Sequence, residues 1–395
     1  MSGNISSINV KHNVDSVIMP ENVKIGLMIA EHRKMCNSIN CPFDYYAYAF
    51  GQSPFHVPAP LEDALKRSAK YGHYSAADGI KELKSSISEF NKRHFDVDVD
   101  SSQVFVGHGT KGIIFTIFSI IDADVIIPSP AWVSYVPQLK FLNQKYYVYR
   151  VVKENNYRID PDNLSTYLMS LPVNKQRLLL LNNPNNPTGV VYSRNELEKI
   201  VTVCRNNNTL ILSDEIYALS TYEIEKFTSV RTLYPEGSFI TNGLSKDRSA
   251  GGYRLGYAII PDKCSEKLAS AFKKIAATIY TNVSTPTQFA AVEAYKPSKI
   301  IEEYFEVTRD IHRIMGTNLS REFDNIDGLH ATKPAGGLYF FVDFNDLTPY
   351  LQKKGIPTSN DLALGLVKHP YHIATVTGDS CLLQPEDFGA RIAFV

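Results

Sequence analysis

The stretch Gly107-His108-Gly109-Thr110-Lys111 is the first place where residue types and spacing suggest chemistry. It follows an apolar run at residues 103–106, and its two glycines and one hydroxyl residue stand where a helix would begin. Backbone N–H groups at such a helix start can bind an anion such as a phosphate. A structural turn in which Thr110 caps the helix explains these residues equally well.

Polar side chains also follow the apolar runs at residues 178–181 and 209–212. The amides between Asn182 and Asn186 suit recognition of a ring hydroxyl, whereas the Asn-Pro pairs by themselves predict only a long turn. Asp214 places a carboxylate at the end of the second run. Taken by itself, such an aspartate is more often the N-cap of a helix.

Lys246 and Arg254 lie eight residues apart in a glycine-containing segment between two apolar runs. A lysine and an arginine at such a spacing are usually surface cations. Here Gly251 and Gly252 indicate a chain reversal, which favours a position beneath a ligand. Each of these stretches is ambiguous alone, so their meaning depends on whether the fold brings them together.

Short apolar runs alternate with segments of helical spacing from about residue 60 onward, which predicts an α/β fold with a parallel sheet covered by helices on both faces. The apolar runs lie at residues 103–106, 125–127, 178–181, 209–212, 239–241 and 255–260, and helical spacing at residues 61–71, 79–93, 195–205 and 263–277. Ligands of open α/β sheets bind at the carboxyl ends of strands. The residues named above should therefore meet at one edge of the sheet.

A long helix is predicted from its N-cap, Ser298, to residue 323, and an alternating, strand-like segment follows at residues 338–344. We expect residues 60–295 to form a large domain. Residues 1–59 and 296–395 should together form a smaller α+β domain.

The composition argues against several classes of partner. The chain has 41 basic and 41 acidic residues, so its charge gives no reason to expect nucleic acid or an anionic membrane. No apolar stretch approaches the ~20 residues of a membrane span, and residues 1–13 lack the apolar core of a secretory signal. The five cysteines form no CxxC pair, which argues against a disulfide framework or a metal site. We expect a soluble cytoplasmic protein.

In their order along the chain, these stretches resemble the class I/II aminotransferases of fold type I, and among them the bacterial-type aspartate aminotransferases. The motifs that carry the resemblance are Ser-Pro-x-Trp-Val-Ser-Tyr at 129–135, Asn-Pro-x-Asn-Pro-Thr-Gly at 183–189, Ser-Asp-Glu-x-Tyr at 213–217, Ser-Lys with Arg-x-Gly-Tyr at 245–257, Pro-x-Gly-Gly-Leu-Tyr-Phe at 334–340 and Arg-Ile-Ala-Phe at 391–394. The resemblance implies a large domain with a mixed, mostly parallel sheet sandwiched by helices, plus a smaller α+β domain. It also implies transfer of an amino group between an amino acid and a 2-oxo acid, with pyridoxal 5′-phosphate as cofactor.

The resemblance assigns roles around the cofactor ring. Lys246 would carry the cofactor as an aldimine and later move a proton on the substrate, which requires a neutral amine part of the time. Asp214 would face the pyridine nitrogen and keep it protonated. Asn186 and Tyr217 would donate hydrogen bonds to the ring hydroxyl oxygen. Trp132 would stack on the ring, with simple core packing as the alternative.

Other residues would hold the phosphate and the substrate. Arg254 suits the phosphate because its planar fork binds bidentately, and Arg391 would bind the substrate α-carboxylate in the same way. Tyr74 would reach the phosphate from a second subunit, which implies a homodimer. The further contacts that the resemblance implies are Gly109, Thr110, Lys111 and Ser245 for the cofactor, and Gly51 and Asn186 for the substrate.

Two positions depart from the family pattern. Gly243 stands where relatives carry a phosphate-binding Ser or Thr, and Asp247 directly follows the lysine without a physical explanation. The substrate also stays open. Residues 280–286 lack the arginine with which one aspartate-specific branch binds a side-chain carboxylate, and the neighbouring aromatic residues suit apolar substrates equally well: Tyr45, Tyr46 and Phe55.

Two other hypotheses remain at this point. One keeps the cofactor and changes the reaction, to a β-eliminating lyase or a cyclopropane-forming synthase, because the same electron sink serves all these reactions. The other is a catalytically idle homologue that acts as a binding module.

Overall fold

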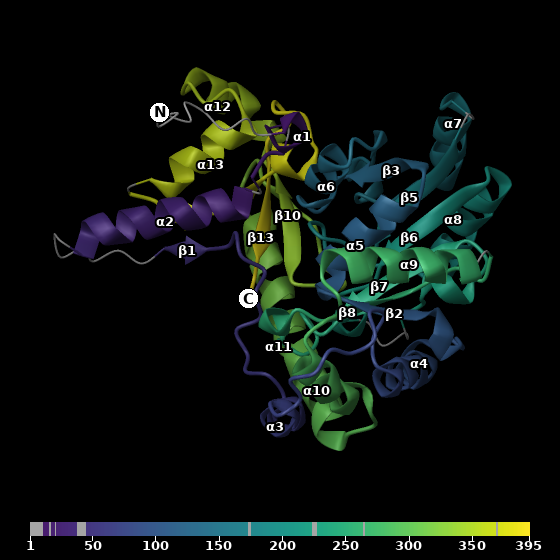
Figure 1. The fold of residues 1–395 in the computed structure, drawn as a ribbon. Helices are drawn as coiled ribbons and strands as arrows, with labels where there is room; N and C mark the ends of the chain where they lie inside the picture. Colours follow the sequence, from purple (N-terminus) through teal and green to yellow (C-terminus); the bar gives the residue numbers. More distant parts are fainter. Residues whose placement is uncertain are drawn as a thin grey trace, which may run out of the picture.

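The computed structural model describes residues 11–15, 17–19, 21–37, 45–172, 175–222, 227–263, 265–368 and 370–395. Residues 1–10, on which the expected absence of a secretory signal largely depends, lie outside this set. A large sheet flanked by helices forms one part of the molecule, and a smaller part built from both ends of the chain lies beside it (Figure 1).

A seven-stranded sheet with the strand order β2-β8-β7-β6-β5-β3-β4 forms the centre of the larger part. Its strands are β2 (Val104–Gly107), β3 (Ala123–Ser129), β4 (Tyr146–Arg150), β5 (Gln176–Asn182), β6 (Thr209–Asp214), β7 (Ser238–Gly243) and β8 (Gly256–Ile259). Neighbouring strands are parallel, except that β8 runs antiparallel to both β2 and β7. The predicted α/β fold with a mixed, mostly parallel sheet is confirmed, and so are the six predicted strands. The edge strand β4 was not predicted; it is only partly buried.

Alternate residues of the central strands show why helices cover both faces of the sheet. On β5, Leu179 and Leu181 belong to one hydrophobic cluster, whereas Leu178 and Leu180 belong to another. The first cluster includes residues of α3 (Ala59–Ser68), α4 (Lys81–Phe95), α7 (Pro161–Ser170), α8 (Arg194–Asn206) and α10 (Thr285–Tyr295), and the second includes residues of α5 (Gly109–Ile120), α6 (Tyr135–Phe141) and α9 (Ser265–Ile279). A strand buried on both faces favours a continuous apolar run, as the leucines of β5 form.

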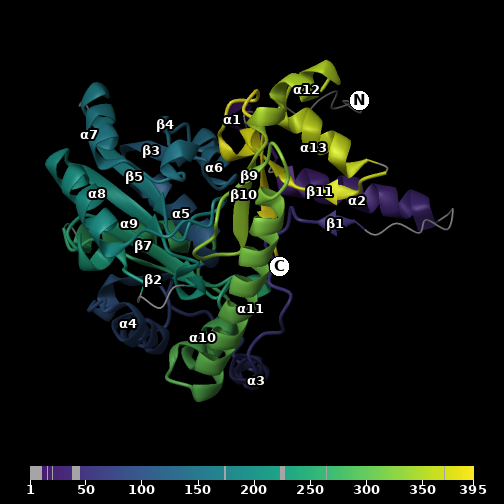
Figure 2. The same ribbon diagram turned by 180° about the vertical axis from the view of Figure 1, so that it is seen from behind.

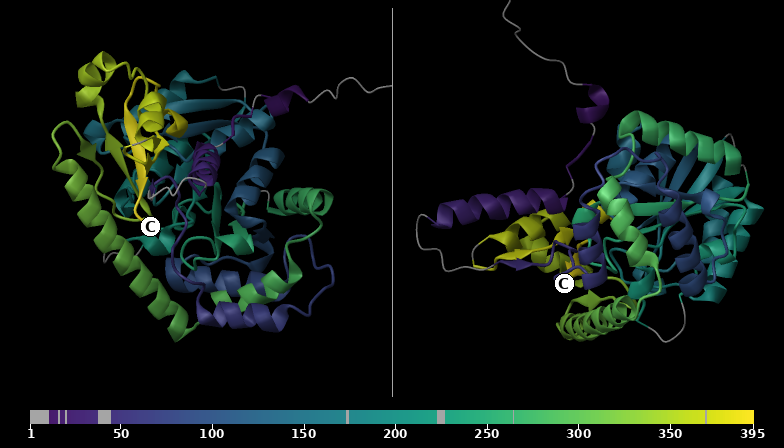
Figure 3. Two further views of the ribbon diagram at one scale, coloured as in Figure 1. Left: turned by 90° about the vertical axis from the view of Figure 1, so that its left-hand side faces the viewer. Right: turned by 60° about the horizontal axis from the view of Figure 1, so that its bottom comes forward.

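The smaller part contains a sheet with the order β12-β13-β10-β9 and a separate parallel pair, β1-β11. The strands are β1 (Tyr46–Ala47), β9 (His330–Ala331), β10 (Tyr339–Asp343), β11 (Ile373–Ala374), β12 (Val376–Thr377) and β13 (Gly389–Ala393). The helices are α1 (His12–Asp15), α2 (Glu21–Asn37), α12 (Thr348–Lys353) and α13 (Ser359–Val367). Helix α2 lies along the C-terminal elements (Figure 3) and shares a hydrophobic cluster with β12 through Ile25, Ile29 and Val376.

The long helix α11 (Lys299–Asp324) runs from α10 and α3 to the smaller sheet (Figure 2). It begins directly after Ser298, as predicted, and the alternating segment at 338–344 forms β10. The division of the chain at residues 60 and 295 stays a prediction. Within the described parts of the chain, no helix is both long enough and apolar enough to cross a membrane.

Candidate active site

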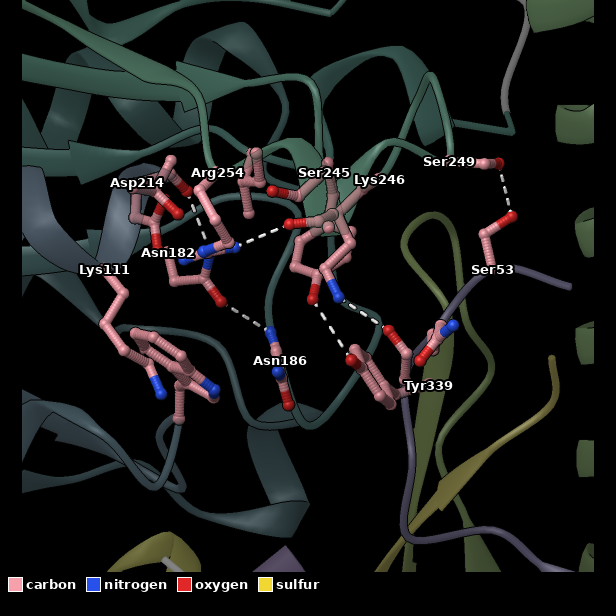
Figure 4. A pocket seen from close by; sticks show the side chains of 18 of the residues that line it. Ser53, Lys111, Asn182, Asn186, Asp214, Ser245, Lys246, Ser249, Arg254 and Tyr339 are labelled. Carbon is pink, nitrogen blue, oxygen red and sulfur yellow. Dashed lines mark hydrogen bonds between the residues drawn. The ribbon is translucent and has the colours of Figure 1, made fainter. Parts of the chain in front are cut away.

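A cavity of about 500 Å³ lies between the carboxyl ends of β5 and β6, strand β10 and the loop after β1 (Figure 4). Most of the predicted site residues line it: Gly51, Thr110, Lys111, Trp132, Asn186, Asp214, Tyr217, Ser245, Lys246 and Arg254. Further lining residues include Ser53, Tyr135, Asn182, Ser249 and Tyr339. The fold therefore brings together stretches that were ambiguous in the sequence.

Asp214 ends β6 and is buried. The register of the sheet places it beside Asn182 of β5 and Thr241 of β7. Thr241 Oγ1 donates a hydrogen bond to Asp214 Oδ1 at 2.9 Å, and the Tyr135 hydroxyl donates to Oδ2 at 2.8 Å. Burial raises the pKa of Asp214 to about 6, although these two hydrogen bonds oppose the rise. Because both partners are neutral, the carboxylate is suited to pair with a cationic ring nitrogen.

The loop after β5 connects Asn186 with Arg391. The backbone N–H of Asn186 donates to Asn182 Oδ1 at 2.7 Å, which fixes the turn. Arg391, on β13, donates from Nη1 to Asn186 Oδ1 at 3.2 Å and from Nη2 to the Ala49 carbonyl at 2.7 Å. Since arginine can only donate, the Asn186 oxygen accepts and its amide nitrogen is left as a donor. Arg391 Nε is buried without a hydrogen-bond partner among the described residues, so the guanidinium can still bind an anion.

Lys246 lies between β7 and β8, and its Nζ donates to the Gly51 carbonyl at 2.6 Å. Next to it, the Tyr217 hydroxyl donates to the Tyr339 hydroxyl at 3.2 Å, and Arg391 Cζ lies 4.5 Å from the centre of the Tyr339 ring. Burial raises the pKa of Tyr339, but the charges of Lys246 and Arg391 and the hydrogen bonds of Tyr217 and Lys246 together oppose it, so the net pKa is lowered. A Cβ at Gly51 would lie 1.6 Å from the Tyr339 hydroxyl oxygen, so a side chain at position 51 has no room.

The start of α5 and Arg254 form another side of the cavity. Gly109 has a φ of +70°, and a Cβ there would lie 2.8 Å from Arg254 Nη2. Arg254 is exposed and donates to the Gly251 carbonyl at 2.7 Å. Thr110 and Ser245 also line the cavity. A helix N-terminus, two hydroxyls and a guanidinium thus face the same space, which suits an anion.

Gly243 has no room for the hydroxyl side chain that the family pattern led us to look for. It pairs with Gly256 across β7 and β8, and a Cβ at Gly243 would lie 2.7 Å from Gly256 Cα and 2.8 Å from the Leu255 carbonyl oxygen. The close approach of the two strands explains this glycine. Two residues later, Ser245 does place a hydroxyl in the lining of the cavity.

The structure also explains Asp247. Its buried carboxylate accepts a hydrogen bond from Arg248 Nη1 at 2.8 Å. Arg248 is itself fully buried, with Cζ 4.5–4.8 Å from the ring centres of Phe90, Tyr295 and Phe305. Asp247 therefore neutralises a buried arginine that anchors the turn after Lys246.

Trp132 and Lys111 line the cavity together, with Lys111 Nζ 5.1 Å from the centre of the indole ring. Desolvation and then the neighbouring cations Arg254 and Lys246 lower the pKa of Lys111. Tyr74, in contrast, is 85% exposed and does not line the cavity. Its predicted role on a second subunit stays a prediction.

Tyr135 and Tyr339 are residues of the cavity that the sequence did not identify. Each lies inside a motif that carried the resemblance, yet neither received a role. Tyr135 forms a hydrogen bond with Asp214, which lies 79 residues away in the sequence, and Tyr339 forms one with Tyr217, which lies 122 residues away. No local spacing could reveal such contacts, and the two motifs were the sole signal.

The donors of the cavity fit pyridoxal 5′-phosphate. The helix start and Arg254 suit a phosphate, the buried Asp214 carboxylate suits a protonated pyridine nitrogen, and Lys246 provides an amine (Figure 4). Among the residues that the structure describes, no cluster of His, Cys, Asp and Glu side chains could hold a metal ion.

Comparison with known proteins agrees with this geometry. Residues 42–394 match the family model described as aminotransferase class I and II. An aspartate aminotransferase of Bacillus subtilis is 34% identical over 307 residues, 75% of each chain. An asparagine–oxo-acid transaminase of Streptococcus mutans is 30% identical over 344 residues, 85% of this chain and 84% of the relative. The crystal structure of an aspartate aminotransferase from Rhizobium meliloti has a TM-score of 0.84 at 25% identity, covering 98% of this chain and 94% of that one.

These relatives are transaminases, so a lyase, a cyclopropane-forming synthase and an idle binding module are not favoured. The resemblance predicted from the motifs is confirmed. The chain is a transaminase and belongs to the class I and II aminotransferases, a family that depends on pyridoxal phosphate.

Proposed function

We propose that this transaminase takes its amino group from a dicarboxylic amino acid, in the first place aspartate, and passes it to a 2-oxo acid. The observation that carries the proposal is the presence of two separate cations. Lys111 lines the cavity, and Arg391 lies behind Asn186 with its Nε unpartnered among the described residues. Two such cations suit a substrate with two carboxylates. The names of the relatives, aspartate and asparagine transaminases, support the same substrate class.

The aromatic residues that left apolar substrates open in the sequence give no support to that alternative. Tyr45, Tyr46 and Phe55 are not among the residues that line the cavity. Lys111 takes the place of the arginine that residues 280–286 lack. A lysine is a compact charge and can serve a carboxylate without the fixed geometry of a guanidinium.

Pyridoxal phosphate, when bound, supplies a sink for the electrons of the breaking Cα–H bond of the substrate. Lys246 acts as the base in its neutral form, taking the Cα proton on Nζ and later returning it. While the proton is on Nζ, the ammonium group can donate to the Gly51 carbonyl, which lies 2.6 Å away. The ionised Asp214 favours positive charge beside it and so assists the withdrawal of electrons.

Arg391 and Asn186 orient the substrate. The guanidinium binds the α-carboxylate, and its bonds to Asn186 and to the Ala49 carbonyl hold its plane in place. Fixing the carboxylate fixes the direction of the Cα–H bond, which selects the bond that breaks. Lys111 then receives the side-chain carboxylate.

The test is the rate of amino transfer from aspartate and from alanine in wild type and in Lys111→Met. Losing a charge-assisted hydrogen bond should raise the KM for aspartate about 10- to 100-fold and leave alanine within about threefold. Lys199→Met, an exposed lysine on α8, is the control. An equal effect of Lys111→Met on both substrates would contradict the proposed role. No transfer from aspartate by wild type would overturn the substrate class.

We further infer a homodimer in which Tyr74 completes the active site of the partner, and we retain the predicted cytoplasmic location. Tyr74 is exposed and remote from the cavity of its own chain, and Arg254 is open to solvent. Mixing inactive Lys246→Ala with impaired Tyr74→Ala chains should restore about a quarter of wild-type activity, since a mixed dimer holds one intact site. If the activity of the mixture stays at the mean of the activities of the two separate variants, the two subunits do not share an active site. Cell fractionation tests the location.

A further inference from the structure

A chain of three hydroxyl groups begins in the cavity and leads away from it. Ser53 Oγ lies 2.5 Å from Ser249 Oγ, and Ser249 Oγ lies 2.6 Å from the Tyr304 hydroxyl (Figure 4 shows the first pair). The Tyr304 hydroxyl then donates to the His56 carbonyl at 2.8 Å. Ser53 and Ser249 line the cavity, whereas Tyr304 belongs to α11.

The direction of every hydrogen bond in this chain is determined. The His56 carbonyl can only accept, so the single hydroxyl proton of Tyr304 is used there. Ser249 must therefore donate to Tyr304, and Ser53 must donate to Ser249. Loss of one hydroxyl thus interrupts the connection between Ser53 and the His56 carbonyl, because no member has a second proton with which to replace a lost bond.

Ser249 adopts a backbone conformation that serine rarely takes. Its φ is +51°, in the left-handed region, where a side chain is disfavoured and glycine is usual. A strained residue in a ligand-binding turn points to a task for its side chain. The task visible here is the hydroxyl chain, since Ser249 is its central member.

The chain joins two segments that meet at Lys246 and connects both to α11. Ser53 belongs to the loop after β1, two residues beyond Gly51, and Ser249 belongs to the turn that follows Lys246. The Gly51 carbonyl is the acceptor for Lys246 Nζ at 2.6 Å. The hydroxyl chain therefore ties the loop that carries the acceptor to the turn that carries the donor, and anchors both on α11.

We propose that Ser249 is a positioning residue, which holds the Gly51 carbonyl in reach of the Lys246 amine through Ser53 and Tyr304. The inference rests on the proton-transfer role proposed for Lys246. A fixed acceptor holds the amine in place and keeps it pointed in one direction. Without the hydroxyl chain, the loop can move away and the amine loses this acceptor.

The experiment compares Ser249→Ala, Ser249→Gly, Tyr304→Phe and the double variant Ser249→Ala/Tyr304→Phe. Each single change should lower kcat about 3- to 10-fold, the effect of one ordinary hydrogen bond, and leave KM within about twofold. The double variant should lose no more than the stronger single variant, because both break one chain. Tyr167→Phe is the matched control, since its hydroxyl also donates to a backbone carbonyl, that of Val148, outside the cavity.

A second measurement does not depend on turnover. In the full chain freed of cofactor, acetylation of Lys246 by acetic anhydride at pH 7–8, followed by mass spectrometry, should be about threefold faster in Ser249→Ala, because the amine is no longer held by a hydrogen bond to the Gly51 carbonyl. Thermal unfolding identifies any variant that fails to fold, and Ser249→Gly, which relieves the strained φ, then provides the decisive comparison.

Two results would overturn the proposal: wild-type kcat and labelling in Ser249→Gly, which would assign the effect to strain alone, or additive losses in the double variant. Failure of aspartate as a substrate would leave these outcomes unaffected, because the labelling needs no substrate and kcat can be measured with any amino acid that reacts.

Discussion

The cavity has two ends that are built in different ways. The Asp214 end consists of Asp214, Tyr135 and Thr241, and the Arg254 end consists of Thr110, Ser245 and Arg254. All side chains of the Asp214 end are buried, and the chain itself holds both carboxylate oxygens. At the Arg254 end none of these three side chains is buried, and Arg254 donates to the Gly251 and His108 carbonyls.

This difference teaches where preorganisation is needed. A buried carboxylate can stabilise positive charge on a bound ligand only if its own position and charge are fixed before the ligand binds. In this molecule, buried side chains of the core fix both. An anion brings its own charge and accepts many hydrogen bonds. An exposed guanidinium and a helix N-terminus can therefore bind it without being held in place beforehand. We therefore expect changes at the Asp214 end to affect turnover, and changes at the Arg254 end to affect cofactor retention.

The largest effect is expected for Asp214→Asn, which keeps the shape of the side chain and removes its charge. The value of kcat should fall about 10³-fold, because a preorganised charge in a buried site is lost. The visible absorbance of bound cofactor should persist, since the Arg254 end is intact. Asp122→Asn, on an exposed side chain, is the control. A kcat within tenfold of wild type would remove the distinction between the two ends.

Arg254→Lys tests the other end. The charge remains, but the planar fork that binds a phosphate bidentately is lost. The dissociation constant of the cofactor, from equilibrium dialysis, should rise about 10- to 100-fold, as for one or two charge-assisted hydrogen bonds. With saturating cofactor, kcat should stay within about threefold of wild type. A collapse of kcat under saturation would show that the Arg254 end also takes part in turnover.

Tyr135→Phe sharpens the comparison within the Asp214 end. It removes the donor to Asp214 Oδ2, which is one of the groups that oppose the rise in the Asp214 pKa. The pKa should rise further above about 6, so that kcat at pH 7 falls about 10-fold, and the loss should shrink toward pH 8.5 as the carboxyl ionises. The test is kcat of wild type and variant measured from pH 7 to 8.5. A loss that is independent of pH would contradict the proposed effect on the Asp214 pKa.

The sequence predicted the parts of the molecule that depend on local pattern. Strands β5, β6 and β7 are short apolar runs because both their faces are buried, and the polar residues after them, such as Asn186, Asp214 and Lys246, had to reach one edge of a parallel sheet. The edge strand β4 was not predicted, because its partly exposed tyrosines form neither a continuous apolar run nor a regular alternation of apolar and polar residues.

Contacts between distant segments could not be predicted in the same way. Gly243 looked like a lost ligand, but it is explained by the approach of Gly256 across two strands. Asp247 had no explanation until its neighbour Arg248 was found among three aromatic rings, which come from the helices α4, α10 and α11. Tertiary packing determines the surroundings of Gly243 and Asp247, and a single sequence does not show which distant residues will contact each other.

The smallest effect concerns the stability of the cofactor-free chain. Burial raises the pKa of Asp214 from 3.8 to about 6, so the folded state binds this proton more tightly than the unfolded state does. The stabilisation by the neutral carboxyl is complete below about pH 4 and is lost as the pH rises through about 6.

Between pH 5 and 6.5 the free energy of unfolding of wild type should fall by about 1 kcal/mol more than that of Asp214→Asn, a shift of roughly 1–2 °C in Tm. The neighbouring Glu215 has a pKa raised to about 7, chiefly by burial and to a smaller extent by the charge of Asp214, so it titrates mainly above this pH range in both proteins. Parallel Tm curves for the two proteins would mean that Asp214 is ionised in the empty site, and that the Asp214 end holds its charge without help from the cofactor.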